Sequence, residues 1–541
     1  MFRALLLLLL AVLCWCFWPV TSGAFVIDDY VFLAQSRMVD APWAAFWSNH
    51  FYEPLYFRPI GVTLWWIATR LFDLNYTAHS VINLILHSVN VVLLAILVRA
   101  LTERVAAALA AAALFALLPF SFTAILWPSN RFDVLAVLFL LLTAIGCIRF
   151  LRNGHPLTWL ATGGAALAAC LSKELAFPIA TATAFLCLFV AKHAPWQRRV
   201  GLFTMLGGAI TLAFVWRHAM LPMPYAAAGG DVLAMLSRGA AAWSDALLKL
   251  FSHATNGASL AAFALGTALL AAVFAAATAI FFPRRTRHHA SGSPTRALFG
   301  AVIILAVSAL TQWPLASNFA PMLDGGALGT TTYARFFYAP AAALAILIGL
   351  IVANARLVRS VATLIVLCAM MIGIQTRTTA EAFARWTQTR IEPISVAAAR
   401  IVDTVSRDSA SPCVVVFLDT QVNNNPWFRM FSDVTVKALT TRPGTTWRCA
   451  VLSESTPWIF ISPANQALAE IGLTPIVIDA KGAVKPDYDW GGVRYRYRTM
   501  ISDVKRLPNA KFFRWNGTAF VDVSDDVLSG KRIVQTHGWG F

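Results

Sequence analysis

The chain has 541 residues, of which 58% are hydrophobic and only 13% are charged, and its 43 Lys and Arg against 26 Asp and Glu give a net charge of +17. This composition excludes disordered, collagen-like and disulfide-scaffold proteins and is typical of a membrane protein. Most of the basic residues lie beside apolar runs, where orientation in a bilayer explains them, so no nucleic-acid partner is expected.

Apolar runs of about 20 residues, the length that crosses a bilayer as a helix, recur through the first 375 residues. The eleven predicted spans are 3–20, 79–98, 105–121, 132–148, 157–171, 174–191, 200–216, 258–282, 297–316, 335–353 and 360–375. The last 166 residues are ordinary mixed sequence. We therefore predict a polytopic α-helical membrane domain over 1–375 and a separate extracytoplasmic mixed α/β domain over 376–541.

The loops that follow alternate spans are short and basic. They contain, among others, Arg99, Arg104, Arg149, Arg152, Arg198 and Arg199. The positive-inside bias places these loops and the N-terminus in the cytoplasm. The connections 21–78 and 217–257 and the C-terminal domain are then extracytoplasmic, and the Ala-rich, Arg-over-Lys composition favours a bacterial inner membrane.

The first span has a second interpretation. Arg3 precedes a leucine run, and small residues follow at 21–24, which is the pattern of a cleaved secretory signal. Bulky aromatic residues such as Trp15 and Trp18 favour a retained span instead. Either interpretation leaves the orientation of the later spans unchanged.

Two adjacent carboxylates, Asp28 and Asp29, open the first external loop, which also contains Tyr56 and Arg58. Neighbouring residues on a helix point about 100° apart. We therefore expect one aspartate to face a cavity and the other to brace the loop. The alternative is that the pair only caps a helix over 30–37.

The second span carries a polar stripe formed by His79, Asn83, His87 and Asn90, which lie on one helix face. Polar groups inside a bilayer either line a wet cavity or bond between helices. Both roles are open here, although two histidines over two turns apart are poorly spaced to share a metal.

Three basic residues each stand where a predicted helix begins on the extracytoplasmic side: Arg131, Lys173 and Arg335. Acidic and aromatic residues accompany them: Asp133, Glu174 and Tyr333. Cations beside positive helix ends suit a phosphate group. Each taken alone is more often an interfacial side chain, but their common depth favours a phosphate site.

An ordered set of short motifs runs through residues 20–340. It comprises Asp28-Asp29-Tyr30, Tyr56-Phe57-Arg58-Pro59, His79 to His87, Leu117-Leu118-Pro119 with Trp127, Arg131-Phe132-Asp133, Leu171-Ser172-Lys173-Glu174 and Tyr333 to Pro340. This series resembles the protein O-mannosyltransferases of the GT-C glycosyltransferase superfamily, and most of all the membrane half of the transmembrane and tetratricopeptide-repeat O-mannosyltransferases. No such repeats follow here, so the acceptor of that subgroup is not carried over.

The resemblance implies an inverting glycosyltransferase that moves a sugar from a polyprenyl-phosphate donor to an acceptor hydroxyl on the non-cytoplasmic face. It implies that Asp28 or Asp29 is the catalytic base and that Arg131, Lys173 and Arg335 bind the donor phosphate. Tyr56, Arg58, His79, His87, Asp133, Glu174 and Tyr333 are expected to line the cavity.

No cofactor is required by this interpretation. The Asp28-Asp29 pair leaves room for a divalent metal, but such a pair alone is a poor predictor of one. No P-loop or Rossmann fingerprint occurs in the sequence.

Two other functions compete. A transporter or flippase of lipid-linked sugars also has polar groups in its spans, but here they gather at helix mouths, and no inverted repeat is visible. A noncatalytic scaffold leaves the ordered motifs unexplained.

The C-terminal domain is predicted to begin with a helical linker over 378–407. Strands are predicted at 413–418, 447–452, 458–462, 475–478, 495–500 and 512–523, with helices at 427–439 and 464–471. Six of the eight cysteines lie in spans, and the other two, Cys413 and Cys449, can form a disulfide if the compartment is oxidising, but the sequence leaves open whether they pair. An interfacial helix within 217–257 and a flexible Gly325-Gly326 loop are also expected.

Overall fold

The structure is a computed structural model. It describes residues 2–26, 28–38, 41–47, 57–118, 124–191, 194–220, 294–319, 334–355, 357–408, 413–418, 435–436, 438–440, 449–453, 458–459, 477–478, 484–485, 495–496 and 509–529. The chain divides into two compact units. The membrane unit contains Met1–Ser22, Thr77–Ala219 and Ala226–Ala384, and the mixed unit joins Gly23–Tyr76 and Met220–Tyr225 with Arg385–Phe541.

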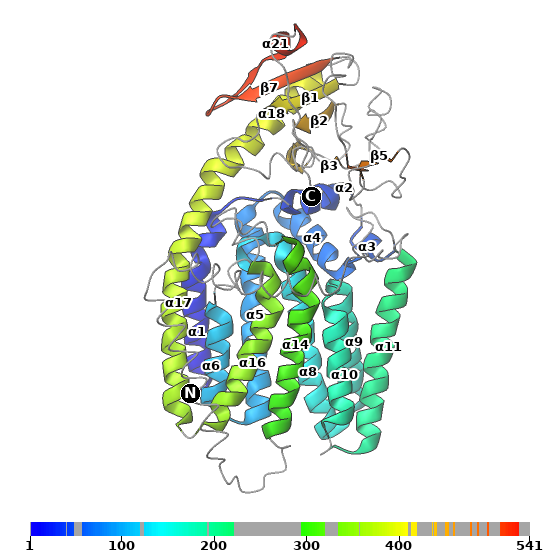
Figure 1. Cartoon of the computed structure of the whole chain (residues 1–541), viewed down its shortest axis with the longest axis vertical. Helices are drawn as coiled ribbons and strands as arrows, with labels where there is room; N and C mark the ends of the chain where they lie inside the picture. The colour runs from blue at the N-terminus through cyan, green and yellow to red at the C-terminus, as the bar shows by residue number, and fades with distance from the viewer. Residues whose placement is uncertain are drawn as a thin grey trace. The chain divides into compact units, whose positions relative to one another are not determined.

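The membrane unit is a bundle of long apolar helices (Figure 1). They are α1 (Phe2–Phe17) with η1 (Trp18–Ser22), α5 (Tyr76–Thr102), α6 (Val105–Leu117), η2 (Pro128–Asn130) with α8 (Arg131–Asn153), α9 (Pro156–Ser172), α10 (Ala176–Phe189), α11 (Trp196–Met220), α14 (Pro294–Phe319), η4 (Ala334–Phe337) with α16 (Tyr338–Asn354), and α17 (Val358–Trp386). Every predicted span coincides with one of these helices except 258–282, which lies outside the described residues.

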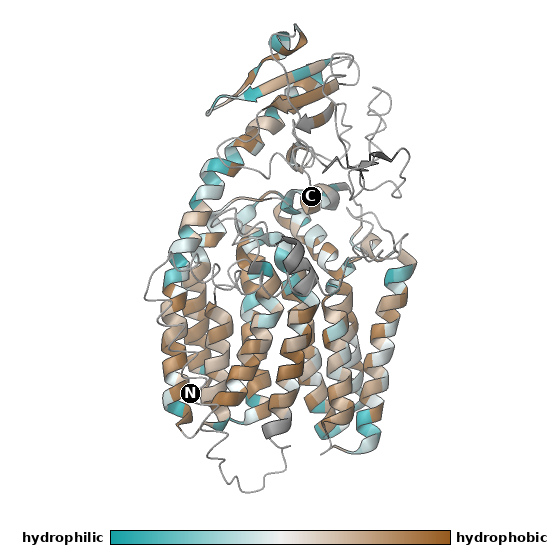
Figure 2. Ribbon diagram, viewed as in Figure 1, coloured by the Kyte–Doolittle hydropathy of each residue, from teal (hydrophilic) through white to brown (hydrophobic). Residues whose placement is uncertain are grey.

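Hydrophobic residues make up most of the length of these helices (Figure 2). Within the described part of the chain, six helical segments have the length and hydropathy to cross a membrane: Phe2–Ser22, Tyr76–Thr102, Pro128–Asn153, Trp196–Met220, Arg335–Asn354 and Val358–Asp408. Shorter apolar helices accompany them at Val105–Leu117, Pro156–Ser172, Ala176–Phe189 and Ala297–Gln312. The protein is therefore a polytopic membrane protein, since such surfaces are stable only in lipid or against one another.

The mixed unit combines a segment near the N-terminus with the C-terminal part of the chain. The first contributes α2 (Asp28–Met38), α3 (Ala44–Trp47) and α4 (Pro59–Phe72). The second contributes η5 (Thr387–Ile391), a π-helical turn, then α18 (Glu392–Asp408), β1 (Cys413–Leu418), β2 (Cys449–Ser453), β3 (Trp458–Ile459), β4 (Val477–Ile478), β5 (Val484–Lys485), β6 (Tyr495–Arg496), β7 (Ala510–Trp515), β8 (Phe520–Asp522) and α21 (Ser524–Leu528).

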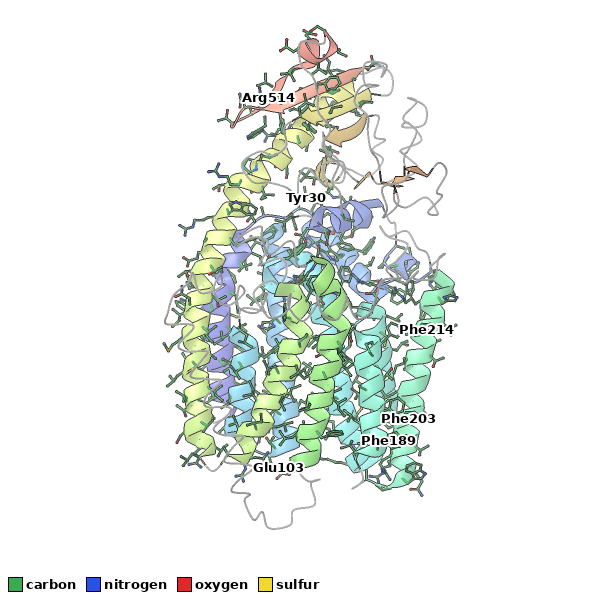
Figure 3. All side chains as sticks on the ribbon, in the orientation of Figure 1. Tyr30, Glu103, Phe189, Phe203, Phe214 and Arg514 are labelled. Atoms are coloured by element: carbon green, nitrogen blue, oxygen red, sulfur yellow. A yellow bond between two sulfur atoms is a disulfide. The ribbon has the colours of Figure 1, made fainter. Side chains whose placement is uncertain are left out.

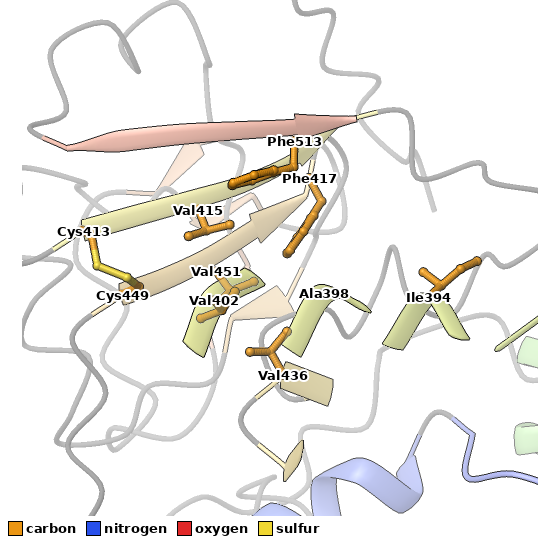
Figure 4. Close-up of a cluster of buried hydrophobic side chains, with 10 residues drawn as sticks. All are labelled: Ile394, Ala398, Val402, Cys413, Val415, Phe417, Val436, Cys449, Val451 and Phe513. Carbon is orange, nitrogen blue, oxygen red and sulfur yellow. A yellow bond between two sulfur atoms is a disulfide. The ribbon is translucent and has the colours of Figure 1, made fainter. Parts of the chain in front are cut away.

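A four-stranded sheet in the order β2-β1-β7-β8 forms the core of this unit. The β1 strand pairs in parallel with β2 and β7, and β8 pairs antiparallel with β7. Apolar residues of α18, among them Ile394, Ala398 and Val402, pack against the sheet in one buried cluster (Figure 4). A disulfide joins Cys413 to Cys449 at the paired starts of β1 and β2, as the sequence allowed.

The structure differs from the sequence-based expectation at two places. The strand predicted over 512–523 is a β7–β8 hairpin, because the Asn516 side chain accepts from the amides of Thr518 and Ala519 while Gly517 adopts a φ of +107°. The helical linker predicted over 378–407 does not start anew, since α17 continues past residue 375 and leads directly into η5 and α18. The helix at 464–471, most of 217–257 and the Gly325-Gly326 loop lie outside the described residues.

Candidate active site

The two adjacent aspartates occupy the first turn of α2, where carboxylates interact favourably with the free amides of a helix start. Asp29 is fully buried, and its Oδ2 accepts a 2.9 Å hydrogen bond from the Val26 amide. The Asp29 amide in turn donates to the Val26 carbonyl. Asp29 thus ties the loop to the helix, while Asp28, one residue earlier, is only partly buried.

The side chain of Tyr30, the next residue, is buried in the mixed unit (Figure 3). Burial raises the pKa of the Tyr30 phenol, a hydrogen bond with Ser395 opposes this, and the nearby charges of Asp29 and Glu392 raise the pKa further. Tyr30 therefore remains a neutral hydrogen-bonding group at physiological pH.

Arg131 is fully buried at the first position of α8, in the membrane unit. Its Nε donates to the side-chain Oδ1 of Asn83 at 3.3 Å, and its Nη2 lies 3.3 Å from the His79 main-chain carbonyl oxygen and 3.4 Å from the His79 Nδ1. The Asn83 amide nitrogen donates to the carbonyls of Ala124, Trp127 and Pro128 in the turn that precedes α8. Two residues of the polar stripe on α5 therefore hold both the guanidinium and its turn in place.

Lys173 and Glu174, at the turn between α9 and α10, each form an ion pair with another helix. Lys173, which is 8% exposed, pairs with Asp133, which is 3% exposed and lies two residues after Arg131 on α8. Glu174 accepts a 2.8 Å bond from Arg217 in the last turn of α11. The sequence interpretation overlooked Arg217, although it directly follows the predicted span 200–216, at a helix end predicted to be extracytoplasmic.

The third predicted cation, Arg335, lies in η4 immediately before α16. Its guanidinium carbon is 4.7 Å from the centre of the Trp127 ring and 4.9 Å from the centre of the Phe336 ring. Because Trp127 belongs to the turn held by Asn83, Arg335 and Arg131 meet the same turn. The structure thus connects all three predicted phosphate-binding cations through the segment 124–133.

The inner half of the polar stripe binds neighbouring helices. The His87 ring contacts the Tyr338 hydroxyl at 2.8 Å through Nδ1 and the Ala116 carbonyl at 3.4 Å through Nε2. Asn90 donates to the Val134 carbonyl at 2.9 Å and to the same Tyr338 hydroxyl at 3.1 Å. His87 and Asn90 are fully buried, so these contacts fasten α5 to α6, α8 and α16.

The remaining predicted site residues fall in different settings. Arg58 is partly buried and precedes α4 as its N-terminal flanking residue. Tyr56 and Tyr333 lie outside the described residues. In the part of the chain that the structure describes, no group of three or more His, Cys, Asp or Glu residues is arranged to hold a metal ion.

A cavity of about 650 Å³ lies between α5, α8, α10, α14 and α16. Its walls are mainly aliphatic, with Val137, Ile179 and Ala339 among the lining residues, but Glu103 and Arg152 also line it. Val137 is four residues after Asp133, on the same face of α8. The apolar space therefore begins about one helical turn from the Asp133–Lys173 pair.

Comparison with known proteins finds a similarity over part of the chain. Residues 57–227 match the family described as dolichyl-phosphate-mannose-protein mannosyltransferase, while no curated protein sequence matches the chain. The matched segment contains Arg131, Asp133, Lys173, Glu174 and Arg217.

Solved structures of low sequence identity also align with the chain. An oligosaccharyltransferase from Archaeoglobus fulgidus, tethered with an acceptor peptide, is 13% identical with a TM-score of 0.42 over 77% of this chain. The chain spans 61% of the length of that protein. ArnT from Cupriavidus metallidurans, apo or bound to undecaprenyl phosphate, is 14% identical with TM-scores of 0.31 and 0.32 over 91% of this chain and 96% of that one. Over residues 57–227, the chain therefore resembles the dolichyl-phosphate-mannose-protein mannosyltransferases.

Proposed function

We propose that the protein is an inverting glycosyltransferase that transfers a sugar from a polyprenyl-phosphate donor to an acceptor hydroxyl on the extracytoplasmic face. The observation that carries this proposal is the connected set of cations around residues 124–133. A fully buried guanidinium at the start of α8, a lysine at the α9–α10 turn and an arginine over Trp127 are suited to a phosphate group that remains at the membrane.

The apolar cavity supports a lipid-linked donor. It provides aliphatic surface beginning one turn from the Asp133–Lys173 pair, so an isoprenoid chain there leaves its phosphate near the cations. The matched family is named for a dolichyl-phosphate-linked sugar, a donor of the same chemical class.

Asp28 is the better candidate for the catalytic base. The Asp29 carboxylate is fully buried and accepts from the Val26 amide, which suits a bracing role. Asp28 is more accessible and stands at the very start of α2.

The reaction then has two halves. Asp28 takes the proton of the acceptor hydroxyl as its oxygen bonds to the anomeric carbon, and the bond from that carbon to the phosphate oxygen breaks from the opposite side, which inverts the configuration. The departing phosphate retains the electron pair, and Arg131, Lys173 and Arg335 stabilise its charge.

The orientation of the chain is part of the proposal. The basic loops after α5, α8 and α10 favour a cytoplasmic location for those helix ends. The disulfide in the mixed unit suits an oxidising, extracytoplasmic compartment of a bacterial inner membrane protein.

The test is sugar transfer by the full chain in nanodiscs, with a panel of polyprenyl-phosphate sugars and envelope glycan or protein acceptors. We expect the parent chain to form an inverted product. We expect Asp28→Asn to lower kcat by about 10²-fold to 10⁴-fold, which is the usual contribution of a general base. Asp29→Asn, the matched control, should reduce thermal stability more than the rate of the folded fraction.

Two results would contradict the proposal. Movement of lipid-linked sugar across liposomes without any transfer would favour a transporter or flippase. Transfer that survives in Asp28→Asn and is lost in folded Asp29→Asn would move the base to the second aspartate.

A further inference from the structure

The segment that carries the aspartates is bound to the π-turn at the start of the C-terminal part of the mixed unit. The Ala24 amide donates to Thr387 Oγ1 at 3.1 Å, a buried bond between residues 363 positions apart in sequence. Thr387 itself is fully buried. The contact is tight, because a Cβ on Gly23 would lie 3.1 Å from Thr387 Oγ1 and 3.0 Å from the Tyr76 hydroxyl oxygen.

A second contact involves the next helix. Tyr30, in the first turn of α2, lies within hydrogen-bonding reach of Ser395 in the first turn of α18. Both side chains are buried, at 4% and 1% exposure. The Ala24–Thr387 bond and the Tyr30–Ser395 contact lie on either side of Asp28 in sequence, so both ends of the short segment 24–30 contact one continuous helix.

The same helix holds the C-terminal sheet. Ile394 and Ala398 flank Ser395 on α18 and pack into the cluster formed with β1 and β2 (Figure 4). The π-turn η5 contains one more residue than an α-helical turn, which rotates everything after it by about 100° relative to an unbroken helix. Insertions of this kind are frequent at functional sites.

We infer that Thr387 and Ser395 are positioning residues, which fix the Asp28 carboxylate by binding the segment 24–30 to the helix that supports the C-terminal sheet. This inference rests on the proposed function, in which Asp28 is the base. It gives the C-terminal sheet a role in the reaction, as the support of the base. A base displaced by about 1 Å loses on the order of 10²-fold in rate.

The test compares Thr387→Val, which keeps the shape and removes the acceptor oxygen, with Thr389→Val. Thr389 lies in the same π-turn, but it is exposed and bonds only within its helix, to the Arg385 carbonyl. We expect Thr387→Val to lower kcat by about 10-fold to 10²-fold with an unchanged KM for the donor. Thr387→Ser should restore the parent kcat, and Thr389→Val should retain it.

Hydrogen–deuterium exchange gives a readout that does not need activity. The peptide 23–30 should exchange faster in Thr387→Val and in Ser395→Ala than in the parent chain and in Thr389→Val. If Thr387→Val does not fold, Ser395→Ala and Tyr30→Phe serve in its place, with the same expected fall in kcat.

Parent-like exchange of this peptide in folded Thr387→Val and Ser395→Ala would overturn the inference. A parent-like kcat in the same variants, while Asp28→Asn is inactive, would overturn the inference and leave the proposed function standing. A third outcome is a parent chain that transfers no sugar, together with faster exchange of the peptide 23–30 in the variants. This would overturn both the proposed function and the role of Thr387 and Ser395 in the reaction.

Discussion

Each of the four residues of the polar stripe on α5 has a partner on a neighbouring element. The sequence left open whether His79, Asn83, His87 and Asn90 bind a ligand or bind other helices. In the structure all four are fully buried. The outer two contact Arg131, and the inner two contact Tyr338 or the neighbouring main chain. The contacts are therefore graded along the helix: His79 and Asn83 hold the Arg131 guanidinium, and His87 and Asn90 bind neighbouring helices.

This grading predicts different consequences for the two asparagines. Asn83→Leu removes the donor to three turn carbonyls and one acceptor for Arg131. Leaving buried polar groups unsatisfied costs about 1–3 kcal/mol each at most, so we expect a loss of about 2–3 kcal/mol in stability. We also expect the KM for the donor to rise severalfold, because Arg131 is no longer held.

Asn90→Leu is the matched control for that experiment. It removes bonds to Val134 and Tyr338 but no contact with Arg131. Its thermal stability should fall by a similar amount, while the KM of the folded enzyme stays near the parent value. Equal effects of both changes on KM would show that the grading has no functional meaning.

Small residues allow the helices of the membrane unit to pack closely. The α6 helix buries an almost continuous run of alanines, from Ala107 to Ala116. Gly349 of α16 faces this run and α5: a Cβ there would lie 2.9 Å from both the Ala111 Cβ and the Val98 Cγ1, and 3.3 Å from the Ala107 carbonyl. Close approach through small residues is the main source of packing between membrane helices.

Gly349→Ala should therefore lower the stability of the membrane unit. Overpacking costs about 1–3 kcal/mol, which exceeds the gain of about 1 kcal/mol from replacing glycine by alanine in a helix. Gly208→Ala on α11 is the control, since a Cβ there has no neighbour within 4 Å. Thermal unfolding in detergent should show a lower Tm for the first change and an equal or higher Tm for the second. An unchanged Tm for Gly349→Ala would contradict the packing argument.

On the scale of the whole molecule, the mixed unit joins the segments Gly23–Tyr76 and Arg385–Phe541, which are separated by more than 300 residues. The boundary expected between residues 375 and 376 is not marked by a break in the backbone, because α17 runs through it to Trp386. Within the mixed unit, the Ala24 amide donates to Thr387 Oγ1, and Tyr30 lies within hydrogen-bonding reach of Ser395. The disulfide adds a covalent link within the C-terminal segment of this unit.

Removal of the disulfide should destabilise the mixed unit. The link closes a loop with a sequence separation of 36 residues, for which the chain-entropy model gives about 4 kcal/mol. We expect Cys413→Ala with Cys449→Ala to make this unit unfold at a lower temperature, measured by limited proteolysis of the full chain during heating. Cys368→Ala, a change at a free cysteine in α17, should leave that temperature unchanged, and equal behaviour of both variants would contradict the expectation.

The membrane class, the spans within the described residues and the strand at 413–418 followed from sequence alone. Each of these depends on how a local run of side chains interacts with water or lipid, and that preference needs no knowledge of a distant partner. The three basic residues at helix ends, Arg131, Lys173 and Arg335, could be identified for the same reason, since a charge beside an apolar run marks the edge of the bilayer.

Only the tertiary structure decided how the polar side chains pair. Arg131 with Asn83, Glu174 with Arg217, and Ala24 with Thr387 join residues from 43 to 363 positions apart. Hydrogen bonds act over about 3 Å and depend on direction, so their partners are chosen by helix packing across the chain. The separate tasks of Asp28 and Asp29 follow from the same cause, because burial and the bond from Val26 distinguish two residues that the sequence presents as equals.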